Sequence, residues 1–386
     1  DDIPQNADLL DSADDAPIIR LINGLIAQAV RRRASDIHVA PFEQALLISF
    51  RIDGILHEAL RLPPRLAPRL ISRIKVMARL DITEKRIPLD GRVSLSLGGK
   101  SIDVRVSTLP SRHGERVVMR LLDKDQAHFH LDALGMSRTA LHDLEQALAQ
   151  PNGIILVTGP TGSGKTTTLY AGLSQLNDGS RNILTIEDPV EYALDGVGQT
   201  QVNSRVGMSF AAGLRAILRQ DPDVVMVGEI RDVETAQIAV QASLTGHLVL
   251  STVHTNSAVA AITRLRDMGV EPFLLASTIK AIIAQRLVRR LCGYCKEPHA
   301  PDQAERRILG LDDPASAPLI YRPKGCDRCN QSGFQGRIGL YELVTINDQL
   351  RRMIHDNATE YALAELAYLT RQNLLQSGFD QCLQGA

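Results

Sequence analysis

Residues 153–166 read GIILVTGPTGSGKT, and this stretch decides the fold. An apolar run that is typical of a buried strand leads into a glycine-rich loop, and TTTLYAGLSQL, which is compatible with a helix, follows. Strand, GxxxxGK[ST] loop and helix in this order are the context that a phosphate-binding loop requires. The glycines allow the backbone to bend so that successive N–H groups point at phosphate oxygens. The stretch predicts a P-loop nucleotide site; the alternative is a strand-to-helix turn without a ligand.

The side chains of this loop suit a nucleoside triphosphate with Mg²⁺. Lys165 supplies a point charge for the β and γ phosphates, and the Thr166 hydroxyl can bind Mg²⁺. We expect ATP to contact Gly159, Pro160, Thr161, Gly162, Ser163, Gly164, Lys165, Thr166 and Thr167.

Four short apolar runs, GIILVTG, NILTIED, DVVMVGE and HLVLSTVH, are separated by segments long enough for crossover helices. This alternation predicts an α/β fold with a parallel sheet that helices cover on both faces. Ligands of such sheets gather at the carboxyl ends of the strands. We therefore expect Glu187, Asp188, Glu229 and His254 to face one cleft with the loop.

The run DPDVVMVGEIRD, residues 221–232, differs from most P-loop nucleotidases, in which the strand ends in an aspartate that holds Mg²⁺. Gly228 stands at that end and Glu229 follows. Neighbouring strand residues point to opposite faces, so this shift moves the carboxylate toward the attacking water. A surface ion pair between Glu229 and Arg231 is the alternative.

The other polar residues at the strand ends receive separate roles. We expect Mg²⁺ to be held by Thr166, phosphate oxygens and water, with help from Glu187 or Asp188. His254, between Thr252 and Thr255, is a candidate sensor of the γ-phosphate, whereas His247 is expected to be structural.

Length and composition limit the class of protein. A chain of 386 residues with 44% hydrophobic content is expected to form two or more globular domains. The 43 basic and 44 acidic residues nearly cancel, which gives no reason to expect a nucleic-acid partner. No apolar run approaches the roughly 18 residues of a membrane span. Because the chain opens at Asp1 without Met, we expect that an upstream domain is missing.

The pattern along the chain divides it into six parts. The first domain is expected to be α+β, because the helical pattern IIRLINGLIAQAV precedes the alternating strand ALLISFRIDG and a hairpin joined by Gly98 and Gly99. Ser137 is a candidate N-cap for the first helix of the second domain. The parts are a disordered acidic lead-in (1–16), the α+β domain (17–124), a linker (125–135), the P-loop ATPase domain (136–286), a tetracysteine subdomain (287–343) and a helical C-terminal subdomain (344–386).

Two CxxC pairs, Cys292 with Cys295 and Cys326 with Cys329, predict a tetrahedral zinc site. Four sulfur ligands leave no open position for catalysis, so the ion would be structural and would stabilise a segment with few apolar residues. Redox chemistry is the alternative. Cys382 stands alone and receives no role.

Five stretches in this order, ASDIH, GPTGSGKTTTLYAGL, TIEDPVEY, ILRQDPDVVMVGEIRD and GHLVLSTVHTN, give the chain a family resemblance. From about Ala16 to its end, it resembles the secretion ATPases of the type II secretion and type IV pilus superfamily, and among them the assembly ATPases of type II secretion systems. The tetracysteine insert is usual in secretion and many pilus-assembly ATPases of this family.

This resemblance implies a hexamer in the cytoplasm, peripheral at the inner membrane, that hydrolyses ATP to power protein export through pseudopilus assembly. It implies inner-membrane platform proteins as partners, although the family's N-terminal docking domain does not match any part of this chain. Arg105 and Arg120 match first-domain arginines that approach the γ-phosphate. Arg215, Arg219 and Arg231 match other family arginines. The alternative is that Arg105 and Arg120 occupy ordinary outward strand positions.

Several alternatives stay open at this stage. Basic residues gather at Arg31–Arg33 and at Arg65, Arg69, Arg73, Lys75, Arg79, Lys85 and Arg86, either on a solvated helix face or against acidic phospholipids or a neighbouring subunit. A type IV pilus assembly ATPase, a helicase-like nucleic-acid motor and a nucleotide-gated scaffold are the competing functions. The 4% aromatic content without Trp argues against the nucleic-acid motor, which needs stacking platforms.

Overall fold

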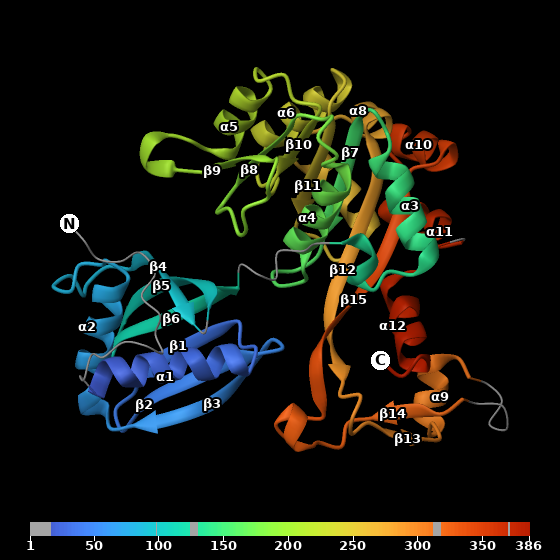
Figure 1. The fold of residues 1–386 in the computed structure, drawn as a ribbon. Coiled ribbons are helices and arrows are strands. Elements are labelled where there is room, and N and C mark those ends of the chain that lie inside the picture. Colours follow the sequence, from blue (N-terminus) through green and yellow to red (C-terminus); the bar gives the residue numbers. More distant parts are fainter. Residues whose placement is uncertain (1–16, 98, 124–129, 312–317, 370) are drawn as a thin grey trace. The chain divides into compact units, whose positions relative to one another are not determined.

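The computed structural model describes residues 17–97, 99–123, 130–311, 318–369 and 371–386, and it divides into two compact units, Asp1–His128 and Phe129–Ala386 (Figure 1). The acidic lead-in, Gly98 and residues 124–129 of the expected domain end and linker lie outside the described residues.

The first unit is an antiparallel sheet with both of its described α-helices packed against one face, which confirms the α+β prediction. The strand order is β3-β2-β1-β6-β5-β4. Its elements are α1 (Pro17–Arg31), β1 (Asp36–Pro41), β2 (Leu46–Ile52), β3 (Ile55–Leu62), a 3₁₀ turn (Pro64–Leu66), α2 (Ala67–Met77), β4 (Leu89–Leu97), β5 (Lys100–Ser111) and β6 (Gly114–Asp123).

Local sequence explains most of these elements. In α1 the buried residues Ile22, Leu25, Ile26 and Ala29 recur at helical spacing and face the sheet. In β2 buried and partly exposed residues alternate from Leu46 onward, as expected. We did not predict β1 and β3. The latter is largely exposed over its first residues and lacks the alternation that would reveal it.

The second unit contains a sheet with the order β15-β12-β7-β11-β10-β8-β9. The four predicted strands are β7 (Gly153–Thr158), β8 (Ile183–Glu187), β10 (Val224–Val227) and β11 (Leu248–Val253), and they are parallel neighbours. β9 (Gly198–Gln201) and β12 (Ile279–Leu291) extend the parallel sheet, and β15 (Phe334–Thr345) pairs antiparallel with β12. The predicted P-loop α/β class is confirmed.

Helices cover both faces of this sheet, because alternate residues of each central strand point to opposite sides. Ile155 and Val157 of β7 pack with α3 (Arg138–Leu148) and α4 (Lys165–Leu176), and Ser137 caps α3 as predicted. Ile154 and Leu156 face the other side. That side is covered by α5 (Phe210–Ile217), α6 (Val233–Leu244), α7 (Ala258–Asp267), α8 (Pro272–Thr278), α10 (Asp348–His355) and α11 (Glu360–Ala367).

The remaining elements form a small module beyond the main sheet, below β12 and β15 in Figure 1. They are β13 (Glu297–His299), α9 (Gln303–Leu309), β14 (Ile320–Arg322) and a 3₁₀ turn (Asp327–Cys329). The last helix, α12 (Leu374–Leu383), contacts β12, β14 and β15.

Three of our expected boundaries differ from the structure. The boundaries at 286/287 and 343/344 fall inside β12 and β15. These two paired strands belong to the main sheet and extend from it to the tetracysteine module. Ile354 and Leu363 of the expected C-terminal subdomain lie in the core of the ATPase domain. The end of the expected linker forms a 3₁₀ turn (Leu131–Leu134) whose Leu131 is buried, because apolar residues there pack on α4.

One basic residue that we assigned to a surface cluster, Lys75, is buried instead. Its ammonium lies 2.8 Å from the Glu115 carboxylate and also donates to the Glu84 carbonyl at 2.6 Å. The side chains of Lys75 and Glu115 are 1% and 7% exposed. Position 75 follows the helical spacing of the buried residues Ile71 and Ile74 in α2, so its side chain points inward. We expected it at the surface because of its charge.

We predict that Glu115→Ala destabilises the first unit by about 3–5 kcal/mol, because it leaves the buried Lys75 charge without its partner. Denaturant unfolding that follows the transition of this unit measures the loss. Glu58→Ala, which breaks an exposed ion pair with Arg61, is the matched control and is expected to leave the midpoint nearly unchanged. Equal midpoints for both variants would contradict the prediction.

Candidate functional site

The loop between β7 and α4 has the backbone that its glycines predict. Gly159, Gly162 and Gly164 have φ angles of 147°, 79° and 88°, a region that side chains other than glycine strongly disfavour. Gly164 is the N-cap of α4, so the helix begins at Lys165. The first turn of α4 presents free N–H groups at this end, which suits an anion.

Lys165 lies over the loop. Its ammonium donates to the carbonyls of Gly159 at 2.9 Å and Pro160 at 3.1 Å. Burial lowers its pKa, the nearby Glu229 carboxylate opposes that shift, and Arg286 adds to it. A cation, a carboxylate and a second cation therefore share one region of the second unit. Of the other loop residues, Pro160, Thr161, Gly162, Thr166 and Thr167 are exposed, whereas Ser163 is buried.

Glu229 follows the end of β10 and is brought to its expected neighbours. Its carboxylate is 13% exposed and forms a close ion pair with Arg231, and its Oε2 lies 3.3 Å from Nε2 of His254. Asp188 is exposed, and its charge contributes to a raised pKa of Arg231 behind the larger effect of Glu229. The ion pair with Arg231 that we considered as the alternative is present. It does not remove Glu229 from the site, because His254 lies beside the same carboxylate and the charge of Glu229 acts on the pKa of Lys165.

Gly228 is explained by the packing of the neighbouring strand. A Cβ atom at this position would lie 3.3 Å from the Ile186 carbonyl oxygen and 3.4 Å from the ring of Phe210, and both distances are tight. The Gly228 N–H donates to the same Ile186 carbonyl at 2.8 Å. A side chain here would require its neighbours to shift by a few tenths of an ångström, so the packing favours glycine at the end of β10, and the next residue carries the carboxylate.

Glu187 has a different environment from the one that we expected. It is 3% exposed, and its Oε1 accepts hydrogen bonds from Thr185 at 2.6 Å and Gln199 at 3.0 Å. The Tyr170 hydroxyl donates to Oε2 in a short hydrogen bond. Protein donors thus occupy both oxygens, and Glu187 connects α4 to β8 and β9. Of the two carboxylates that we considered for Mg²⁺, Asp188 is the exposed one.

The histidines and the remaining arginines of this unit separate by position. His247 Nδ1 lies 2.8 Å from the Ala242 carbonyl at the end of α6, which fits its expected structural role. Arg215 pairs with Glu234 at 2.6 Å, and Arg219 donates to the Arg215 carbonyl.

In the first unit, Arg105 and Arg120 are direct cross-strand partners on β5 and β6. Asp36, from the ASDIH stretch, accepts from Arg120 Nε at 3.0 Å and lies 3.8 Å from Arg51 Nε. Arg92 on β4 is the partner of Arg105 on its other side. Asp36 stands in the same row between Arg51 and Arg120, so its carboxylate offsets part of the repulsion between these arginines.

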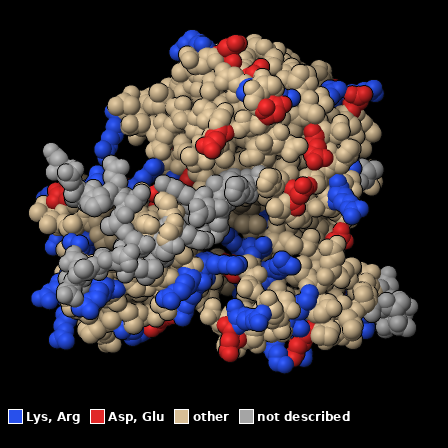
Figure 2. Space-filling view, viewed as in Figure 1, with Lys and Arg blue, Asp and Glu red and all other residues tan. Residues whose placement is uncertain are grey.

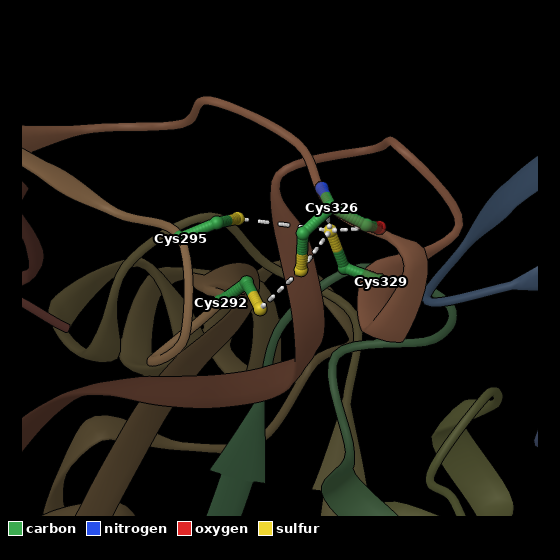
Figure 3. Close-up of side chains that lie close together, drawn as sticks. All are labelled: Cys292, Cys295, Cys326 and Cys329. Carbon is green, nitrogen blue, oxygen red and sulfur yellow. Dashed lines mark hydrogen bonds between the residues drawn. The ribbon is translucent and has the colours of Figure 1, made fainter.

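The four cysteines converge at the end of β12 (Figure 3), and their ligand atoms all lie within 4.8 Å of one another. The sulfur pairs 292/326, 295/329 and 326/329 are separated by 3.9, 3.8 and 3.7 Å. Tetrahedral ligation with Zn–S bonds of about 2.3 Å requires sulfur separations of about 3.8 Å. The thiols therefore fit a zinc ion.

Hydrogen bonds favour the thiolate of Cys329, whereas burial raises the pKa of Cys295 to about 12. Backbone N–H groups of Cys326 and Gly333 donate to Cys329 Sγ, each at 3.2 Å. Although burial opposes ionisation, these donors lower the pKa of Cys329 to about 6. Donors of this kind hold the ligand atoms in place before a metal binds.

Sequence reasoning missed three residues of the site: Tyr170, Gln285 and Arg286. Gln285 is 1% exposed and donates to the Ser163 carbonyl, and Arg286 donates to the Asn256 carbonyl two residues after His254. The signal that could have revealed them is the pair of polar residues, Gln285 and Arg286, inside the apolar run IIAQRLV, which indicates that β12 lines the site.

Among the described residues of the basic clusters, Arg65, Arg69, Arg79, Lys85 and Arg86 are exposed. Lys and Arg side chains predominate on the face of the first unit that Figure 2 shows. In the part of the chain that the structure describes, no helix is long and apolar enough to span a membrane.

Comparison with known proteins gives a consistent result. The family described as "Type II/IV secretion system protein" matches residues 11–386. The chain is 58% identical to type II secretion system protein E of Pseudomonas aeruginosa, over all of this chain and 76% of that protein. It is also 58% identical to type II secretion system ATPase E of Vibrio cholerae, with the same coverage. A solved structure of the pilus retraction motor PilT with bound ADP is 29% identical, covers 94% of this chain and 92% of its own, and has a TM-score of 0.63.

We predict that Tyr170→Phe lowers the free energy of unfolding of the second unit by about 1–3 kcal/mol, because buried Glu187 loses a donor. Burial and the Glu187 charge raise the pKa of Tyr170 far above its ordinary value, so the phenol remains the donor at all ordinary pH values. Thermal or denaturant unfolding measures the change. Tyr361→Phe, at a tyrosine that is 79% exposed, serves as control; a Tyr170→Phe midpoint equal to it would contradict the assignment.

Proposed function

Because this chain belongs to the type II/IV secretion system protein family, we propose that it works as a hexameric motor whose ATP hydrolysis drives pseudopilus assembly during type II secretion. The chain is an ATPase of type II secretion: two relatives at 58% identity are named type II secretion system protein E and type II secretion system ATPase E. The observation that carries the mechanism is the convergence of the Lys165 loop, Glu229 and His254 at one edge of the sheet. The pilus-assembly alternative has less support, because the relatives at 58% identity are named for type II secretion, whereas the pilus protein compared above is a retraction motor at 29% identity.

The site residues divide the work of phosphoryl transfer. The N–H groups of the loop and of the first turn of α4 hold the phosphate oxygens, and Lys165 turns from the Gly159 and Pro160 carbonyls to the β and γ phosphates. Glu229 orients the attacking water, and His254 beside it senses whether the γ-phosphate is present. The ion pair with Arg231 holds the Glu229 carboxylate at the edge of the site.

Two metals belong to this proposal. Thr166 at the start of α4 would hold Mg²⁺, with the exposed carboxylate of Asp188 as a supporting group; when bound, the ion would neutralise charge on the phosphates. Cys292, Cys295, Cys326 and Cys329 would hold zinc, which supplies folding free energy to the module after β12.

Partners and location complete the proposal. A hydrolysis site of this class needs a guanidinium on the γ-phosphate, and the row with Arg105 and Arg120 is suited to supply it. We place the hexamer in the cytoplasm at the inner membrane, bound to platform proteins, with acidic phospholipids against the exposed basic residues of α2 and the segment after it. The balanced charge and 4% aromatic content support the absence of a nucleic-acid partner.

We predict that Glu229→Gln lowers the rate of phosphate release at saturating ATP by about 100-fold or more while ATP binding is retained, because only the water loses its orienting carboxylate. Lys165→Ala is expected to lose both binding and turnover. Glu234→Gln, which changes an exposed glutamate of α6, is the matched control. A Glu229→Gln variant as fast as wild type would refute the role of Glu229, and a wild-type chain without turnover would favour the scaffold alternative.

We predict that the purified chain holds about one zinc ion and that Cys326→Ser removes it, because a three-thiol site binds zinc more weakly. Metal analysis and proteolysis of the module after β12 are the measurements. Cys382→Ser, at an exposed cysteine outside the cluster, controls for the loss of a thiol. Full zinc content in Cys326→Ser would show that the cluster is not the site.

A further inference from the structure

We propose that Gln285 of β12 is a positioning residue for the phosphate-binding loop, and this inference rests on the proposed function of that loop in binding ATP. Gln285 belongs to no nucleotide-binding sequence pattern. It lies in the middle of β12, more than a hundred residues after the loop in the chain.

The topology brings Gln285 to the point where the loop begins. β7 and β12 are parallel partners up to Thr158, the last residue of β7, which pairs with Ala284. The backbone ladder between the two strands ends there, but β12 continues to Leu291 beside β15 (Figure 1). The loop that follows Thr158 therefore runs against β12 without a strand ladder to hold it.

Beyond the end of the backbone ladder, the Gln285 side chain connects β12 to the loop by hydrogen bonds. Its Nε2 donates to the Ser163 carbonyl at 2.6 Å, and its Oε1 accepts from the Thr168 hydroxyl at 2.8 Å. Thr168 belongs to the first turns of α4, so one amide joins the loop, the helix and the strand. Gln285 is 1% exposed and Thr168 is 3% exposed, so water does not replace these bonds.

The bond to Ser163 fixes the direction of a loop N–H. The Ser163 carbonyl and the Gly164 N–H belong to one planar trans peptide, in which they point in opposite directions. Because the carbonyl is held toward β12, the Gly164 N–H points away from β12, to the open side of the loop. A phosphate-binding loop depends on the direction of such N–H groups.

The loop is also packed tightly on this strand. A Cβ atom at Gly159 would lie 2.5 Å from the Gln285 carbonyl oxygen, and one at Gly164 would lie 3.1 Å from Gln285 Nε2. Thr168 holds the amide in the orientation that presents Nε2 to Ser163. Without that amide, the Ser163 peptide would have no donor at this contact, and the loop would sample orientations that do not bind phosphate.

Titration with mant-ATP and Mg²⁺, together with steady-state hydrolysis, tests the inference. Gln285→Met keeps the length of the side chain but removes both hydrogen bonds, and we expect the Kd and KM for ATP to rise about tenfold with a smaller change in kcat. Thr168→Val, which removes the hydroxyl that orients the amide but leaves the bond from Gln285 to Ser163 in place, is expected to raise Kd by a smaller factor.

Asn152→Leu is the matched control. The Asn152 amide also donates to a backbone carbonyl, that of Ser243 at 3.1 Å, but it precedes β7 at the opposite edge of the sheet. Asn152→Leu is expected to lower the melting temperature without changing Kd. If loss of stability alone weakened ATP binding, Kd would rise in this variant as well.

Wild-type affinity in Gln285→Met, or an equal loss of affinity in Asn152→Leu, would overturn the inference. If Gln285→Met does not fold, an unchanged Kd in Thr168→Val overturns it instead. Lys165→Ala distinguishes a failure of the proposed phosphate site from a failure of the role of Gln285. If Lys165→Ala also binds ATP like wild type, the proposed phosphate site itself fails, whereas loss in Lys165→Ala alone rejects only the role of Gln285.

Discussion

The proposed nucleotide site of the second unit depends on the direction of the backbone N–H groups between Gly159 and Lys165. Three glycines with positive φ allow the turn, and α4 begins at the loop's end, so that its free N–H groups can bind the same anion as the loop. The loop makes no strand ladder of its own. Its geometry comes from its neighbours, β7 before it, α4 after it and β12 beside it, which is why a buried side chain of a distant strand contributes to the site.

The same sheet explains the displaced carboxylate. Gly228 lies close to Ile186 of β8 and Phe210 of α5, so the end of β10 favours a residue without a side chain. The carboxylate is supplied by Glu229, which lies beside His254 and whose charge acts on Lys165. Glu187, one residue before the exposed Asp188, is used internally to connect α4 with β8. Neighbouring acidic residues thus have separate roles that follow from which side of the strand each one faces.

Strong local patterns allowed the sequence to predict the parallel strands, the helix α1, the Ser137 cap, the glycine conformations and the cysteine cluster. The misses share a physical cause, because they depend on contacts between distant segments. Lys75 is buried although it is basic, because it pairs with Glu115. This partner lies 40 residues away in the chain, so the local sequence does not reveal it. β12 and β15 cross the boundaries that we expected. We placed those boundaries by the change in composition at the cysteine-rich module, and composition does not show that both strands continue from the main sheet into it. Gln285 and Tyr170 become part of the site only through their tertiary partners.

Amide hydrogen exchange of the chain with and without Mg²⁺ and ATP tests the central claim most directly. The account predicts that ATP slows exchange at the N–H groups of residues 161–167 more than anywhere else in the second unit, and that Lys165→Ala abolishes this protection. Protection by ATP that leaves these residues unchanged, or that persists fully in Lys165→Ala, would contradict the account.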